Sequence, residues 1–169
     1  MEKTVFYWQI AGFIFTSIAG TLLHFLYDWS NQNILFAPFS AVNESIREHM
    51  KLLFFPMFTF ALIESRYLEK QYENFWCVKL AGIALGLTLI PVLYYSYTGI
   101  LGVSADWVNI AIFFITAAAT YLLETKLLKK EGTCCITSQL ALIILFLLVL
   151  AFTVLTFHPL HIPLFQDPT

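Results

Sequence analysis

The sequence is poor in charged side chains for a chain of its length. Charged residues make up 12% of its 169 positions, whereas a soluble domain carries about 25%. Hydrophobic residues account for 59% and gather in long blocks. This composition argues against an ordinary soluble domain and predicts a protein that lies in a lipid bilayer.

Basic runs and cysteine motifs are also missing. The formal net charge is −2 and no stretch clusters Lys and Arg, so no nucleic-acid partner is expected. The three cysteines form no C-x-x-C pair, which argues against a zinc ribbon or a thiol redox site. The first apolar block lacks a small-residue cleavage site, and we expect a retained helix there and not a signal peptide.

Five apolar blocks predict an all-α, polytopic membrane helix bundle with about five transmembrane helices. A helix needs about 20 residues to cross a bilayer, and these blocks lack the alternation of a β-barrel strand. We expect a single integral membrane domain over residues 1–169, with unknown oligomeric state. The expected helices cover about 5–27, 49–66, 75–97, 107–128 and 138–157, and a proline-rich tail covers 158–169.

The distribution of Lys and Arg predicts the orientation. If the N-terminus is cytoplasmic, seven of these nine residues lie inside and only Arg47 and Lys51 lie outside. We therefore predict the N-terminus in and the C-terminus out, in the cell membrane of a bacterium (the cytoplasmic membrane). Glu44 and Glu48 then lie on the predicted outer side. So does every histidine and aspartate, namely His24, His49, His158, His161, Asp28, Asp106 and Asp167.

The glutamates on the predicted inner side receive a simpler interpretation. Most of them have a Lys or Arg close by in the sequence, as solvated charge at a membrane surface usually does. Glu64, with Arg66 or Lys70, is interpreted as an interfacial ion pair, which contributes little to stability.

His24 and Asp28 form the first candidate site. A spacing of four residues places both side chains on one face of the first helix. Ser17, Gly20 and Thr21 continue that face, and small or polar residues mark the side of a membrane helix that packs on other helices. The pair is expected to point into the bundle, either as a metal or proton site or as a hydrogen-bonded helix end.

A second motif begins the second helix. Ser45 and Glu48 fit the S-x-x-E capping box, in which two side chains bind free N–H groups at a helix start. Asn43 could serve as the cap instead. Capping explains part of this motif but not its density of charge.

Five ionisable residues lie within eight positions of that motif. Glu44 and Glu48 share a helix face, where like charges disfavour each other. Arg47, Lys51, a bound cation or a proton could neutralise them. His49 adds an imidazole at the same level.

The proline-rich tail carries the third candidate. His158 and His161 would share one face of a polyproline II segment, which repeats every three residues. The tail is too apolar to stay in water, and we expect it to fold back over the outer mouth of the bundle. Asp167, near its end, is assigned a structural role, and packing with incidental histidines is the alternative.

The chain resembles a small bacterial membrane family of unknown function. The resemblance rests on His24-x-x-x-Asp28, on the run from Asn43 to Lys51, and on the ending from His161 to Pro168. A looser similarity links it to the membrane hydrolases that include alkaline ceramidases and the progestin/adiponectin receptors. That similarity implies zinc held by an H-x-x-x-D pair and later histidines. The chain departs from the pattern in having five expected helices instead of seven and H-x-x-H instead of H-x-x-x-H.

The function predicted from these patterns is a metal-dependent membrane hydrolase acting on a lipid-like substrate. A catalytic zinc takes three protein ligands and keeps one position for water. The candidate catalytic carboxylates are Glu48, Asp28 and Glu44. The expected metal ligands are the four histidines, His24, His49, His158 and His161.

Two other classes remain open. A transporter or channel for a small solute would use the charged cluster as a proton or cation site, although ion-coupled transport needs ionisable groups near the bilayer midplane. An accessory membrane subunit would use the cluster for docking.

Overall fold

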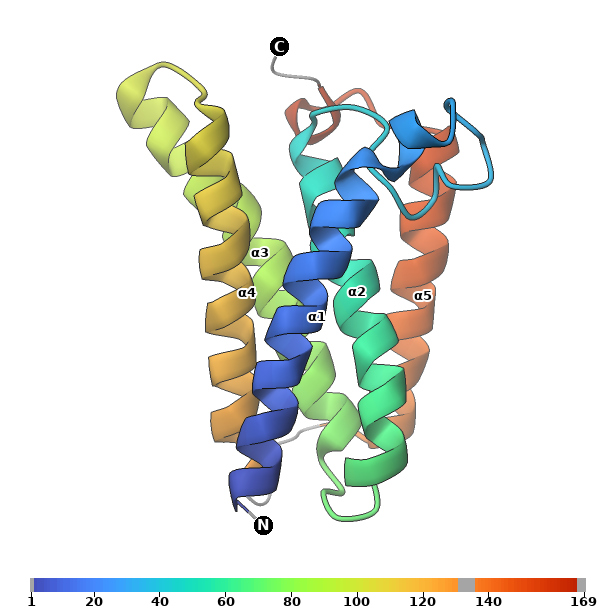
Figure 1. Cartoon of the computed structure of the whole chain (residues 1–169), viewed down its shortest axis with the longest axis vertical. Helices are drawn as coiled ribbons and strands as arrows, with labels where there is room; N and C mark the ends of the chain where they lie inside the picture. The colour runs from blue at the N-terminus through green and yellow to red at the C-terminus, as the bar shows by residue number, and fades with distance from the viewer. Residues whose placement is uncertain (1, 131–135, 167–169) are drawn as a thin grey trace.

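The computed structural model is an all-α bundle and describes residues 2–130 and 136–166 (Figure 1). Within those ranges it contains five α-helices, one short 3₁₀ helix and no strand. The prediction of five helices is confirmed, and the last predicted helix, 138–157, matches at both ends. The elements are α1 (Glu2–Trp29), α2 (Ile46–Leu68), α3 (Phe75–Leu101), α4 (Asp106–Leu128), α5 (Ser138–Phe157) and η1 (Pro163–Phe165).

Four of these helices are long and apolar enough to cross a membrane, namely α1, α3, α4 and α5. α2 is as long as α4 but carries ionisable residues near both of its ends. It lies inside the bundle and contacts all four of the others. Arg47, Glu48, Lys51 and Glu64 are buried there, away from any lipid. Charged groups in a membrane protein face the bundle interior because exposure to hydrocarbon is costly.

The predicted packing face of α1 is confirmed at Gly20. A Cβ at this position would stand 2.9 Å from the backbone oxygen of Leu52 in α2 and would clash with the ring of Phe113 in α4. Only glycine allows three helices to meet this closely. His24 lies one turn further along α1, so the contact directs it toward the interior of the bundle.

The histidines gather at one end of the bundle, as the topology predicts. Figure 1 places this end opposite the N-terminus, where α1 finishes, α2 begins and the C-terminal tail lies. We call it the outer end, and its orientation in a membrane stays a prediction from charge. The expected return of the tail is confirmed: the ring of Phe165 lies 5.1 Å from the Arg47 guanidinium carbon, and η1 packs on α2.

The capping box predicted for the start of α2 is wrong in its side-chain contacts. Ser45 is the N-cap residue, but its side chain makes no capping hydrogen bond. Asn43 Oδ1 accepts from Ser45 N at 3.1 Å, which forms a turn before the helix. Glu48 reaches past the cap and accepts from Val42 N at 3.0 Å, because it is drawn into a buried ion network described below.

Candidate functional site

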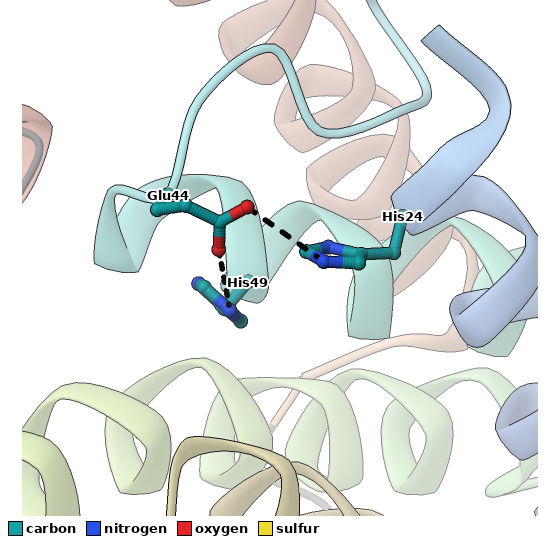
Figure 2. A group of neighbouring side chains, drawn as sticks. All are labelled: His24, Glu44 and His49. Atoms are coloured by element: carbon teal, nitrogen blue, oxygen red, sulfur yellow. Dashed lines mark ion pairs between the residues drawn. The ribbon is translucent and has the colours of Figure 1, made fainter. Parts of the chain in front are cut away.

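Three side chains with metal-binding atoms meet at the outer end. His24 lies in the last turns of α1, Glu44 in the loop before α2, and His49 in the first turn of α2. One ligand atom from each lies within 4.8 Å of the others. Figure 2 shows the Glu44 carboxylate between the two imidazole rings, with one oxygen directed toward each.

Glu44 joins the two histidines directly. His24 Nε2 lies 3.7 Å from Glu44 Oε1, and His49 Nε2 lies 3.8 Å from Glu44 Oε2. The ring centroids of His24 and His49 are 5.9 Å apart. Both imidazoles therefore direct their Nε2 atom toward the carboxylate of Glu44.

Local backbone contacts hold this arrangement. Ala41 N donates to Leu23 O at 3.4 Å, which ties the loop to α1 beside His24. His49 Nδ1 lies 3.1 Å from Ser45 O, and a carbonyl can only accept, so Nδ1 carries the proton. Nε2 of His49 is then the nitrogen with a free lone pair, which is the form that a metal needs.

The donor set fits zinc. Two imidazole nitrogens and one carboxylate oxygen are the protein ligands of a well-known class of catalytic zinc sites. Bonds of about 2.0–2.2 Å in a tetrahedron place neighbouring ligand atoms roughly 3.3–3.5 Å apart. The distances of 3.7 and 3.8 Å run to different oxygens of Glu44, and the three ligand atoms lie within 4.8 Å of one another. Side-chain rotations that shorten these distances would bring the three atoms to tetrahedral spacing, and three protein ligands leave a fourth position for water.

The three residues open on a cavity of about 830 Å³ between α1, α2, α4 and the loop that precedes α4. Its wall is mostly apolar, from Gly20, Phe25 and Leu52 on one side to Ile110 and Phe113 on the other. Figure 1 shows α3 and α4 leaning away from α1 toward this end. The cavity thus combines a polar corner, which holds the candidate ligands, with an apolar body of ligand size.

The other sequence-predicted metal residues lie elsewhere. Asp28, one turn beyond His24, is exposed, and so are His158 and His161 in the tail. None of these three belongs to the one metal-competent group found among residues 2–130 and 136–166. Asp167 lies outside the described residues. Of the four predicted histidine ligands, the structure therefore brings together His24 and His49.

Glu48 has ionic partners that occupy both of its oxygens. Its Oε1 pairs with the Arg47 guanidinium, and its Oε2 lies 2.6 Å from Lys51 Nζ. Glu48 and Lys51 are both 0% exposed. A carboxylate held between two cations is poorly placed to take a proton from water, so its position favours a structural role.

The same network joins α2 to the end of α5 and to the α1–α2 loop. Lys51 Nζ donates to Ala37 O at 2.8 Å and to Thr156 Oγ1 at 3.3 Å. Arg47 donates to Thr156 Oγ1 at 3.3 Å and to Phe152 O at 3.5 Å. Arg47, which the sequence assigned a structural role, thus helps to fasten the outer ends of α2 and α5 together.

A second ion cluster lies near the opposite end, and sequence reasoning missed it. Lys79 Nζ in α3 lies 2.5 Å from Glu64 Oε2 in α2 and 2.6 Å from Glu124 Oε2 in α4. Gln9 Nε2 in α1 donates to Glu64 Oε1 at 2.7 Å. All four side chains are buried, and both glutamates are 0% exposed.

The interpretation of Glu64 as an interfacial ion pair with Arg66 or Lys70 is therefore wrong. Arg66 and Lys70 are exposed, whereas Glu64 points into the bundle. A usable signal was present on α4, where Thr116, Thr120 and Glu124 recur every four residues. That spacing places three polar groups on one face of an otherwise apolar helix, which marks a packed interior face.

Comparison with protein families gives one match. A family model described as a family of unknown function, DUF6512, matches residues 2–169. The chain belongs to this family. The family brings no activity with it, and comparison with curated proteins and with solved structures finds no match.

Proposed function

We propose that this protein is a metal-dependent membrane hydrolase that acts on a lipid-like substrate, with zinc held by His24, Glu44 and His49. The observation that carries the proposal is the position of these three residues, at the polar corner of a cavity of about 830 Å³. Two histidines and a glutamate leave a fourth zinc position for water. The ligand set differs from the sequence prediction in using Glu44 in place of a tail histidine.

The cavity wall supports a substrate that comes from the bilayer. Phe25, Ile110 and Phe114, on α1 and α4, line the cavity and are exposed. On a membrane-spanning helix such side chains meet lipid tails. An acyl chain could enter between α1 and α4 and lie along this wall, with its polar end toward His24 and His49.

Each polar group at the cavity has a chemical role in the proposal. Bound zinc would supply a water molecule whose proton is lost near neutral pH. Asp106 is the carboxylate of the cavity outside the ligand set and is proposed to take that proton. Asn109 and Ser104 line the same wall, where they can bind a carbonyl or a polar headgroup.

Metal analysis of the purified protein tests the ligand assignment. We expect about one zinc per chain after purification in detergent and dialysis against a weak chelator. His24→Ala and His49→Ala should lose the metal, because two remaining ligands bind zinc weakly. His158→Ala and His161→Ala are matched controls that remove a histidine from the same end and should keep the metal. Equal zinc in all five proteins, or zinc in none, would contradict the site.

Lipid hydrolysis tests the reaction. Zinc-loaded protein is expected to release fatty acid from a panel of ester- and amide-linked lipids in mixed micelles, and a strong chelator should stop the release. Asp106→Asn should lower the rate by about 10²–10⁴-fold while zinc stays bound, because only the proton acceptor is removed. Asp28→Asn makes the same change on an exposed residue outside the cavity and should leave the rate unchanged. Loss of zinc in Asp106→Asn would assign that residue to metal binding instead.

A further inference from the structure

The inner ion cluster has an unbalanced charge. Two carboxylates, Glu64 and Glu124, share the single ammonium of Lys79. The other described elements add no ionised group that faces it: α1 contributes Gln9 and Thr16, and α4 contributes the hydroxyl of Tyr121. The sequence of α5 contains no charged residue. With both glutamates ionised, the cluster would carry a net negative charge inside the bundle.

A buried net charge is unfavourable by several kcal/mol, and proteins usually remove it by binding a proton. Glu124 Oε1 is the atom placed to hold one. It is buried and has no hydrogen-bond partner in the described part of the chain, whereas Glu124 Oε2 faces Lys79. Gly82 of α3 makes room for this carboxyl group, because a Cβ there would clash with it.

Two more unpaired hydroxyls continue from Glu124 along α4. Thr120 and Thr116 follow at intervals of four residues on the same face, both are 0% exposed, and neither hydroxyl has a hydrogen-bond partner in the described chain. Helix threonines usually bind the carbonyl four residues earlier, as Thr88 and Thr125 do at 2.6 and 2.7 Å. The hydroxyls of Thr120 and Thr116 are free to accept one proton and donate another.

The row runs along α4 toward the outer cavity. Thr116 lies one turn of α4 below Phe113, which lines that cavity together with Asn109, one turn further on. Thr116 is at the middle of a helix that runs from Asp106 to Leu128. The polar face therefore extends from the inner cluster to the centre of the bundle and ends one helical turn short of the cavity lining.

We propose that Glu124 binds one exchangeable proton and that Thr120 and Thr116, with water molecules bridging from one to the next, relay it between the inner cluster and the outer cavity. The carboxylate gains an O–H bond at Oε1 when a hydronium ion gives it a proton and becomes water, and it breaks that bond when the proton moves on. Each threonine hydroxyl accepts one proton and releases another, so its O–H bond is replaced and it stays neutral after the transfer. The relay does not depend on a metal at His24 and His49, and it would give the protein a proton-conducting activity of its own.

Infrared difference spectroscopy between acidic and alkaline pH tests the proton site in lipid nanodiscs. The wild-type protein is expected to show the carbonyl band of a protonated carboxyl, shifted in deuterium oxide. Glu124→Gln should remove the band, whereas Glu69→Gln, which changes an exposed glutamate, should keep it. Gly82→Ala should shift the band by crowding the carboxyl group. Absence of the band, or its persistence in Glu124→Gln, would overturn the site.

Proteoliposomes with an enclosed pH-sensitive dye test the relay. The Thr116→Val and Thr120→Val double variant keeps the side-chain shapes and is expected to slow proton equilibration by about tenfold or more. Thr88→Val, on an exposed face of α3, is the matched control and should leave the rate unchanged. An unchanged rate in the double variant would overturn the relay and leave the cluster a structural ion pair. The zinc content of these variants should equal that of the wild type, which separates this result from the metal site.

Discussion

Replacing Lys79 by methionine is expected to lower the free energy of unfolding by about 3–5 kcal/mol. The substitution keeps the volume of the side chain but leaves Glu64 and Glu124 without their shared cation, and both are 0% exposed. Removal of one partner from a buried ion pair is strongly destabilising because the remaining charge has no compensation. Thermal unfolding in detergent, followed by circular dichroism, measures the change.

The charge explanation predicts a rescue. Adding Glu64→Gln and Glu124→Gln to Lys79→Met removes every charge from the cluster and should restore most of the lost stability. Lys126→Met, which changes an exposed lysine of the same end of the bundle, is the control and should alter stability by no more than about 0.5 kcal/mol. If the triple variant is no more stable than Lys79→Met, the effect comes from lost packing and not from charge.

A second large loss is expected for Glu48→Ala. This change leaves Arg47 and Lys51 buried beside each other without their carboxylate, and it removes the acceptor of Val42 N. We expect a loss of about 3–5 kcal/mol, again read from thermal unfolding. Because the two basic residues fasten α2 to α5 through Thr156, the outer end should loosen first.

Glu44→Ala is the matched control, because Glu44 is four residues away and its side chain is 49% exposed. Its loss should change stability by no more than about 0.5 kcal/mol but should weaken zinc binding, whereas Glu48→Ala destabilises the fold. A double-mutant cycle with Lys51→Met should show a coupling of about 0.5–3 kcal/mol between Glu48 and Lys51. Additive effects would contradict the network and revive a catalytic role for Glu48.

The helices were predictable because each membrane-spanning segment must satisfy its own backbone hydrogen bonds and remain apolar over its length. The end of the bundle at which each loop lies follows from the order of the helices, because a loop joins the end of one helix to the start of the next. This is why His24, Glu44 and His49 could be expected at one end before any contact was known. Their meeting was expected only in outline, and the structure selects Glu44 instead of His158 or His161 as the third member.

The loop between α1 and α2 explains that difference. It is tied to α1 through Ala41 and Leu23, which brings Glu44 between the two histidines. The tail instead turns toward Arg47, where Phe165 packs, and this leaves His158 exposed. Proline spacing shows that the tail is not a helix, but it does not show which part of the outer end the tail covers.

The sequence by itself determined that this protein is a helical bundle in a membrane and that its histidines share one end. The length and number of the apolar segments were sufficient for these predictions, because neither depends on which helices pack against each other. Only the tertiary structure decided which charges are buried. Glu64 and Glu124 are far apart in the chain from Lys79, and their burial depends on which faces of α2, α3 and α4 meet. The same holds for the outer end, where packing places Glu44 beside the histidines and Glu48 between two cations.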